Sequence, residues 1–294
     1  MVEGVVFSEI RQFFSFLVIM YEQLRLEPGH QGSIWRHRQW PPMSIAHWHE
    51  ELELNIVLKG TAAYLVGRNR VDLAPNVLLW LFPEPEHILI DQSPDFEMWI
   101  LVFRPALLQQ VCNEPDTVIL LEHIPEGLFC RRLSQPMLQR LGNLCQEMLQ
   151  AQGETTRFNL GLGFLLLSAW SAYQKANEPA MVKGIHPAVA QTVHLIMNDL
   201  EEDALPELAQ RVGLSPSRLS RLFQQQTGMS LTDFRNQVRV RRVTQMVDEQ
   251  PVTTLLEIAL QAGFGSYAQF HRVFKQVMGV SPRAYFSATS ASSE

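Results

Sequence analysis

The carboxy-terminal third of this 294-residue chain contains the same pattern twice. Ala209 and Gly213 in the first copy match Ala259 and Gly263 in the second, fifty residues later. Gly265 then adds one residue and the offset becomes fifty-one, so Leu219, Arg221, Phe223, Gly228 and Ser230 match Phe270, Arg272, Phe274, Gly279 and Ser281. A repeat of this kind indicates a structural unit that occurs twice, and it restricts the fold more than any other feature of the sequence.

Each copy has the pattern of two helices joined by a short turn. Gly213 and Gly263 stand where a first helix ends, at a position that favours positive φ. Ser215 and Ser266 stand at the expected N-cap of a second helix. Apolar residues then recur at i, i+3 and i+4, which predicts a buried face formed by Leu219, Leu222 and Phe223, and by Phe270, Val273 and Phe274. This is the plan of a helix-turn-helix, whose second helix lies in the DNA major groove.

The segment between the two copies predicts one long helix over residues 231–248. Ser230 and Asp233 have the spacing of a capping box, and apolar residues follow at helical intervals. Such a rigid connection would place two reading helices in successive major-groove segments, about 34 Å apart. Residues 211–242 hold seven arginines and one acidic residue. An arginine-rich segment can be a solvated helix face or a phosphate-binding surface, and the repeated scaffold favours phosphate binding.

The second copy carries a motif that resembles the AraC/XylS-type bacterial transcription regulators. The matching residues are Ile258, Ala259, Gly263, Phe264, Phe270, Arg272, Phe274, Lys275, Gly279, Ser281, Pro282 and Tyr285. The resemblance covers residues 187–287. It implies that outward residues of both reading helices contact DNA, namely Ser217, Arg218, Ser220, Arg221 and Gln224 in the first copy, and Tyr267, Ala268, Gln269, His271 and Arg272 in the second.

Arg221 and Arg272 are the best candidates for base contacts, because a guanidinium can bind guanine through two hydrogen bonds. A phosphate contact or an intramolecular ion pair is the alternative for each arginine. Ser217 and Ser220 are small, so the first reading helix is expected to contact fewer bases than is usual in the family. Gln224 also departs from the family pattern, in which lysine is frequent at this position.

The amino-terminal half has the period-two pattern of β-strands. His47, His49, Glu53 and Asn55 share one parity, while large apolar residues occupy the other, as in strands with one polar and one apolar face. Short strands at this pitch favour a barrel or a sandwich. We therefore expect an α+β multidomain fold: a cupin-like β-barrel with flanking helices, then an all-α domain with two helix-turn-helix units joined by a long helix.

The spacing of His47, His49, Glu53 and Gly60 resembles the first motif of the cupin barrel, and the segment around His87 loosely resembles the second. AraC-type regulators carry a cupin-like domain here and most bind a small effector without metal. An effector pocket lined by His47, His49, Glu53 and His87, with no cofactor, is therefore the favoured interpretation. In cupin enzymes these residue types bind zinc, manganese or iron, so a metal site is the second interpretation. A purely structural role is the third.

Sugar is one candidate effector class. Five of the six tryptophans lie in the amino-terminal half, where their faces could stack on a sugar ring or pack in the barrel core. The segment from His47 to Asn55 also resembles sugar-responsive members of the family.

Composition and turn residues suggest the domain limits. We expect an uncertain N-terminal segment over 1–35, a cupin-like effector-binding and dimerisation domain over 36–175, a linker over 176–186, the DNA-binding domain over 187–287 and a disordered tail over 288–294. Helices predicted near 136–149 and 158–173 could pack within the chain or form a dimer seam, and the family resemblance favours a homodimer.

The composition indicates a globular chain with a formal charge of −6, so its positive charge is local. Cys112, Cys130 and Cys145 form no CxxC pair, which favours a reducing cytoplasm and ordinary core thiols. The apolar run at 13–20 is shorter than the about 20 residues of a membrane span and lacks a basic leader. We therefore expect no membrane association, and Met20 is an alternative start of the protein.

These features predict a cytoplasmic, sequence-specific transcription regulator, with activation as the favoured mode. Its expected partners are operator DNA, a small-molecule effector, and RNA polymerase if it activates. We expect no catalysis, because the sequence has no glycine-rich phosphate loop, nucleophile elbow or Cys/His zinc spacing. The alternatives are a metal-dependent cupin enzyme fused to a DNA-binding domain, and a regulator whose barrel only dimerises.

Overall fold

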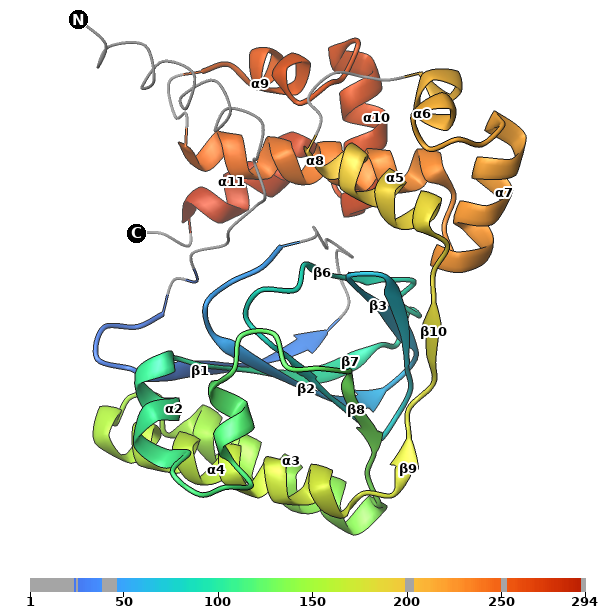
Figure 1. The fold of residues 1–294 in the computed structure, drawn as a ribbon. Helices are drawn as coiled ribbons and strands as arrows, with labels where there is room; N and C mark the ends of the chain where they lie inside the picture. Colours follow the sequence, from blue (N-terminus) through green and yellow to red (C-terminus); the bar gives the residue numbers. More distant parts are fainter. Residues whose placement is uncertain (1–23, 25, 39–46, 199–203, 250–252, 292–294) are drawn as a thin grey trace, which may run out of the picture.

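The computed structural model describes residues 24, 26–38, 47–198, 204–249 and 253–291. The apolar run at 13–20 and Trp40 lie outside these residues. Figure 1 shows three layers: helices α2, α3 and α4 on one side, a β-barrel in the middle, and the carboxy-terminal helices on the other side. The expected fold class, with a cupin-like barrel, flanking helices and a helical domain, is confirmed.

Two antiparallel sheets form the barrel. In the part of the chain described, the larger sheet has the order β1 (Gly32–Arg38), β7 (Glu97–Phe103), β2 (Leu52–Lys59), β5 (Val77–Leu81), β8 (Phe129–Arg132) and β9 (Glu178–Pro179). The smaller sheet has the order β10 (Val182–Gly184), β4 (Asn69–Leu73), β3 (Ala62–Val66) and β6 (His87–Ile90). Apolar side chains such as Tyr64, Leu79 and Met98 fill the space between the sheets.

Strand β2 is buried on both faces. Leu52, Leu54 and Ile56 pack against helices α2 (Pro105–Val111), α3 (Gln135–Gln150) and α4 (Thr155–Lys175), whereas Val57 belongs to the barrel interior. Glu53 and Asn55 alternate with the first set, as the period-two pattern predicted. The polar residues of β2 therefore point into the barrel.

The sheet face that meets the helices also holds two tryptophans. Trp80 and Trp99 lie in the core between the larger sheet and the helices. They can neither stack on a ligand inside the barrel nor pack its interior, because strand alternation turns both side chains away from it. The sugar-stacking interpretation is therefore wrong for these two residues, and core packing holds, although the core lies between the larger sheet and the helices and not inside the barrel.

The segment expected as a linker forms two short strands. β9 pairs with β8 of the larger sheet, and β10 pairs with β4 of the smaller one. Backbone hydrogen bonds to sheet edges order this polar segment, which composition alone could not indicate. At the domain ends, β1 begins at Gly32, inside the expected N-terminal segment, and α11 (Pro282–Ala291) extends into the expected tail. Residues 292–294 lie outside the described part.

The helical domain contains two helix-turn-helix units arranged along one long helix (Figure 1). After α5 (Pro187–Asn198), unit 1 consists of α6 (Leu205–Arg211) and α7 (Pro216–Thr227). Helix α8 (Leu231–Glu249) follows, and unit 2 consists of α9 (Leu255–Gln261) and α10 (Tyr267–Met278). The amino-terminal half of α8 packs with unit 1 through Phe234 and Val238, and its carboxy-terminal half packs with unit 2 through Val240 and Val243. The predicted connecting helix is confirmed.

The turns of the two units share their backbone geometry. Gly213 and Gly263 have φ values of 72° and 89°, as predicted for residues that end a helix in the left-handed region. The Ser266 hydroxyl accepts a hydrogen bond from the Gln269 amide at 3.2 Å and caps α10. Ser215 has extended backbone angles at the same position but makes no side-chain cap bond. Ser215 is therefore the N-cap residue of α7, as predicted, but its hydroxyl makes no cap hydrogen bond.

The cysteines are core residues, as the sequence predicted. All three are buried free thiols, and burial raises the pKa of Cys112 to about 11 and the pKa values of Cys130 and Cys145 to about 12. Thiols of this kind are poorly reactive, because the thiolate is the nucleophile. No helix among the described residues has the length and apolar composition that a membrane span requires.

Candidate functional site

The outward faces of α7 and α10 form the candidate DNA interface. On α7, Ser217, Arg218, Arg221 and Gln224 are exposed and Ser220 is half-buried. The apolar residues Leu219 and Phe223 turn the opposite way and are fully buried. The hydrophobic spacing of the sequence thus orients the helix, and it leaves one polar face available to a duplex.

Helix α10 repeats this arrangement. Tyr267, Ala268, His271 and Arg272 are exposed, over a buried face that contains Phe270 and Phe274. Gln269 differs, because its Oε1 accepts a hydrogen bond from the Gly265 amide at 2.9 Å and is held at the turn. This makes Gln269 the weakest candidate of the second set for a base contact.

Most arginines of the predicted phosphate-binding segment interact with other parts of the protein. Arg242 donates hydrogen bonds to the carbonyl oxygens of Ile196 and Met197 at the end of α5. The Arg239 guanidinium lies 5.9 Å from the centroid of the Phe264 ring, within the about 6 Å of a cation–π contact. By contrast, neither Arg221 nor Arg272 has a hydrogen bond or ion pair with any other described residue. Among the described residues, no acidic side chain therefore forms the alternative intramolecular ion pair with Arg221 or Arg272.

The four residues of the predicted barrel site lie together at one end of the barrel interior. His49, Glu53 and His87 are buried, and His47 is half-buried. One potential metal-binding atom from each residue lies within 4.8 Å of the others. The backbones of His47 and His87 are bridged by two hydrogen bonds of 3.1 and 3.0 Å, which join the segment before β2 to β6.

Hydrogen bonds fix the orientation of these side chains. His49 Nδ1 lies 3.0 Å from the Glu51 carbonyl oxygen, and its Nε2 lies 3.1 Å from Glu53 Oε2. His87 Nδ1 lies 3.1 Å from the Pro85 carbonyl oxygen, and its buried Nε2 has no hydrogen-bond partner in the described part of the chain. Since a carbonyl oxygen only accepts, each Nδ1 carries a proton. Both Nε2 atoms therefore point into the cluster.

The charges of the cluster depend on one another. Burial raises the pKa of the Glu53 carboxyl, but the hydrogen bond from His49 and the positive charge of the histidines outweigh burial and lower it to about 2. Burial and the charge of His47 lower the pKa of His87 to about 3. Burial opposes protonation of His49 as well, yet its contact with Glu53 raises the His49 pKa overall. The site thus holds one carboxylate that faces several imidazoles.

Two further residues complete the cluster. Asn55 Nδ2 donates a hydrogen bond of 2.7 Å to Glu53 Oε1, and the Tyr64 hydroxyl donates to the same oxygen at 3.4 Å. Asn55 shares the parity of Glu53, so the sequence signal for it was present. Tyr64 was missed, because nothing in the sequence indicates which β3 residues face β2.

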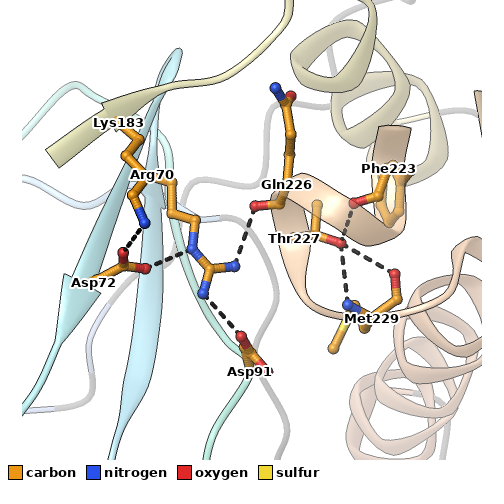
Figure 2. A network of polar contacts seen from close by, with 8 residues as sticks. All are labelled: Arg70, Asp72, Asp91, Lys183, Phe223, Gln226, Thr227 and Met229. Atoms are coloured by element: carbon orange, nitrogen blue, oxygen red, sulfur yellow. Dashed lines mark hydrogen bonds and ion pairs between the residues drawn. The ribbon is translucent and has the colours of Figure 1, made fainter. Parts of the chain in front are cut away.

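A second polar network joins the barrel to unit 1 (Figure 2). Arg70 on β4 contacts Asp72 at 2.6 Å and Asp91 at 2.8 Å, and it also donates a hydrogen bond of 3.1 Å to the Gln226 carbonyl oxygen of α7. Lys183 on β10 pairs with Asp72 at 2.8 Å. The network borders a cavity of about 560 Å³ between the two domains. No sequence pattern indicated this network, since Arg70 and Gln226 lie far apart in the chain.

Apolar contacts reinforce this junction. Leu65 and Ile88, on the outer face of the smaller sheet, belong to the same buried cluster as Val193 of α5 and Phe223 of α7. Unit 1 and the barrel therefore share one hydrophobic core.

Comparison with known proteins agrees with both halves of this arrangement. A family model described as an AraC-like ligand binding domain matches residues 31–167, and one described as a helix-turn-helix domain matches residues 208–288. The arabinose operon regulatory protein of Escherichia coli (strain K12) is 32% identical over 245 residues, which cover 79% of each chain. The chain belongs to the AraC/XylS-type family of transcription regulators.

Other members of the family match over a similar length. The melibiose operon regulatory protein of Escherichia coli (strain K12) is 22% identical and covers 83% of each chain. The HTH-type transcriptional activator RhaR of Cronobacter sakazakii is 24% identical, over 81% of this chain and 85% of the relative. As an AraC-type protein with both domains, the chain is a DNA-binding transcription regulator that responds to a small molecule.

Proposed function

We propose that this AraC-type regulator reads its operator with the two exposed faces of α7 and α10. The observation that carries the proposal is the matched position of Arg221 and Arg272, which are both exposed on reading helices above fully buried aromatic residues. Each guanidinium can make two hydrogen bonds to a guanine edge in the major groove. The remaining outward residues, Ser217, Arg218, Ser220 and Gln224 on α7, and Tyr267, Ala268, Gln269 and His271 on α10, then contact neighbouring bases or phosphates.

The proposed effector site is the polar end of the barrel interior. His47, His49, Glu53 and His87 line it, and the half-buried His47 is the member nearest to solvent. A sugar is the effector class that we favour, because carboxylate and imidazole groups bind hydroxyls and because relatives are named for the arabinose and melibiose operons. Activation is the favoured mode, as in the relative named an activator, and RNA polymerase is then a partner.

The Arg70 network and the shared hydrophobic core provide the route from barrel to DNA. A ligand that moves β3 or β6 also moves the surface against which unit 1 packs. The ligand can shift DNA occupancy only by its different affinity for the two arrangements. If the two arrangements differ at the Arg70 contact with α7, a shift between them would reorient one reading helix relative to the other.

Homodimerisation through α4 completes the proposal. The side chains of Leu160 and Phe164 are 74% and 55% exposed, one helical turn apart on the outer face of this helix. The other face of α4 packs on the barrel through Leu162 and Leu166, so intrachain packing and a dimer seam use different sides. We further propose that the protein acts in the cytoplasm, where its DNA lies, and that it is not an enzyme, since its relatives are regulators along most of their length.

The test of the DNA-binding role uses the full chain and a duplex selected with it from a random-sequence pool. Fluorescence anisotropy at fixed salt should give an affinity at least about 1,000-fold higher for the selected duplex than for a shuffled one. Equal affinities would refute sequence-specific reading. Adding a panel of sugars, and aromatic acids as a second class, then tests the effector, and an unchanged affinity and unchanged intrinsic fluorescence across the sugars would exclude that class.

A further inference from the structure

We propose that His47, His49, Glu53 and His87 bind one divalent transition-metal ion. Their four donor atoms lie within 4.8 Å of one another. Four tetrahedral ligands, each at about 2.1 Å from a zinc-type ion, lie about 3.4 Å from one another, so the widest separation in the cluster exceeds that of a bound site by about 1.4 Å. Small side-chain rotations therefore suffice to bring all four donors to one ion. This departs from the sequence-based expectation of an effector pocket without a cofactor.

The surroundings of the two buried histidines have the form that metal sites require. In such sites a ligating histidine usually donates its other ring N–H to a backbone carbonyl or a carboxylate, which fixes its orientation. His49 and His87 do this through Nδ1, to the carbonyl oxygens of Glu51 and Pro85. Each Nε2 is thereby directed at the centre of the cluster, without any help from a bound ion.

The geometry also leaves two polar contacts incomplete, and one bound cation would complete both. His87 Nε2 is buried and has no hydrogen-bond partner among the described residues, and a buried polar atom in this state is costly. His49 Nε2 faces Glu53 Oε2 at 3.1 Å, so either a proton or a cation must lie between these atoms. A metal ion at the centre would give His87, His49 and Glu53 a common partner.

Hydrogen bonds also fix the orientation of the Glu53 carboxylate. Asn55 holds Glu53 Oε1 at 2.7 Å and Tyr64 approaches the same oxygen, which leaves Oε2 directed at the imidazoles. Three imidazole nitrogens and one carboxylate oxygen suit zinc, iron, manganese, cobalt or nickel rather than magnesium or calcium, which prefer oxygen ligands alone. The half-buried His47 supplies the side by which an ion can enter.

Metal binding would cross-link three parts of the barrel. His47 and His49 precede β2, Glu53 lies on β2 of the larger sheet, and His87 lies on β6 of the smaller sheet. Ile88, next to His87, packs on the other face of β6 against the DNA-binding domain. The ion would therefore restrain the strand on which unit 1 rests. This inference deepens the proposed effector site and rests on the proposed function only for this last step.

The experiment uses the full untagged chain, stripped with a chelator and titrated with Co²⁺ alone. We expect one equivalent to bind, with visible absorption bands of a nitrogen- and oxygen-coordinated ion and a rise in Tm. Glu53→Gln, which keeps the side-chain volume, should weaken Co²⁺ binding by at least tenfold, and Asn55→Ala by about tenfold, as for other residues that orient a ligand. His123→Ala is the matched control, because His123 is exposed and pairs with Glu84 outside the cluster.

Absence of the absorption bands and of any Tm change in the unmodified chain would overturn the proposal, as would equal binding by Glu53→Gln. Circular dichroism of each variant separates loss of a ligand from loss of the fold. The selected duplex is then offered to the metal-free protein. Normal DNA binding without Co²⁺ binding refutes the metal site and leaves the proposed function intact. Co²⁺ binding without sequence-specific DNA binding supports the metal site and refutes the proposed function.

Discussion

The two helix-turn-helix units are copies in sequence but have different surroundings. Unit 2 packs with the second half of α8 and with α11, and the buried cluster around Phe274 contains no barrel residue among those described. Unit 1 packs with the first half of α8, but its cluster around Phe223 continues into the smaller sheet of the barrel. Arg70 adds a hydrogen bond to the last turn of α7.

This difference assigns different tasks to similar units. Unit 2 can keep its structure whatever the barrel does, because its core is its own. Unit 1 shares its core with the ligand-binding domain, so changes in the barrel reach it directly. Under the proposed function, the regulator therefore has one reading helix that is independent of the barrel and one that the barrel can adjust.

The largest effect is expected from the two central aromatic residues. Phe223 and Phe274 are fully buried, and replacing either with alanine should cost about 3–5 kcal/mol of stability in its own cluster. Hydrogen exchange should show that Phe223→Ala loosens unit 1 together with β3 and β6, whereas Phe274→Ala loosens unit 2 alone. Loss of protection in β3 and β6 in Phe274→Ala would contradict the independence of unit 2.

The next effect concerns DNA affinity. Arg221→Ala and Arg272→Ala should each weaken binding to the selected duplex by about 1–3 kcal/mol while leaving the fold intact. Each variant should relax the base preference in a different segment of the duplex, and the segment read by unit 1 should be the shorter, because Ser217 and Ser220 are small. Reselection from the random pool with each variant measures this. Unchanged affinity and preference for either variant would remove that arginine from the interface.

The tether between barrel and unit 1 should give a smaller effect. Arg70→Ala removes the hydrogen bond to Gln226 and the contacts with two aspartates, at a cost of about 1 kcal/mol after allowance for the partial exposure of this network. Amide exchange in the last turn of α7 should accelerate, with no change in α10. Lys183→Ala is the control, since Lys183 pairs with Asp72 but does not reach α7. Equal acceleration in the control would assign the effect to the barrel.

The smallest effect separates the helix caps. Ser266→Ala removes a side-chain cap and should cost about 1 kcal/mol in unit 2. Ser215→Ala removes no cap bond and should change unit 1 by a few tenths of a kcal/mol at most. Amide exchange in the first turn of α7 and of α10 distinguishes the two outcomes. A larger loss for Ser215→Ala would show that the hydroxyl caps α7 in solution.

Most of the fold and both candidate surfaces were predictable from the sequence, because they depend on local patterns. Helical spacing and turn glycines depend on neighbouring residues, so the two units and the connecting helix were predictable. The parity of β2 likewise placed Glu53 inside the barrel. The sequence did not predict that Trp80 and Trp99 pack between the larger sheet and the helices, because the direction of a strand face is set by the elements that cover it. It also failed for the residues of β9 and β10, whose order comes from distant sheet edges.

By itself the sequence determined that this chain has two helix-turn-helix units and a barrel with three histidines and a glutamate on its polar positions. Only the tertiary structure decided that His49 and His87 turn their Nε2 atoms toward one centre, that Tyr64 joins them, and that Arg70 reaches α7. The physical reason is the distance along the chain between the residues that make contact. Repeats, caps and strand parity arise from contacts between residues close in the chain, whereas a binding centre and a domain junction arise from segments that meet only when the whole chain is folded.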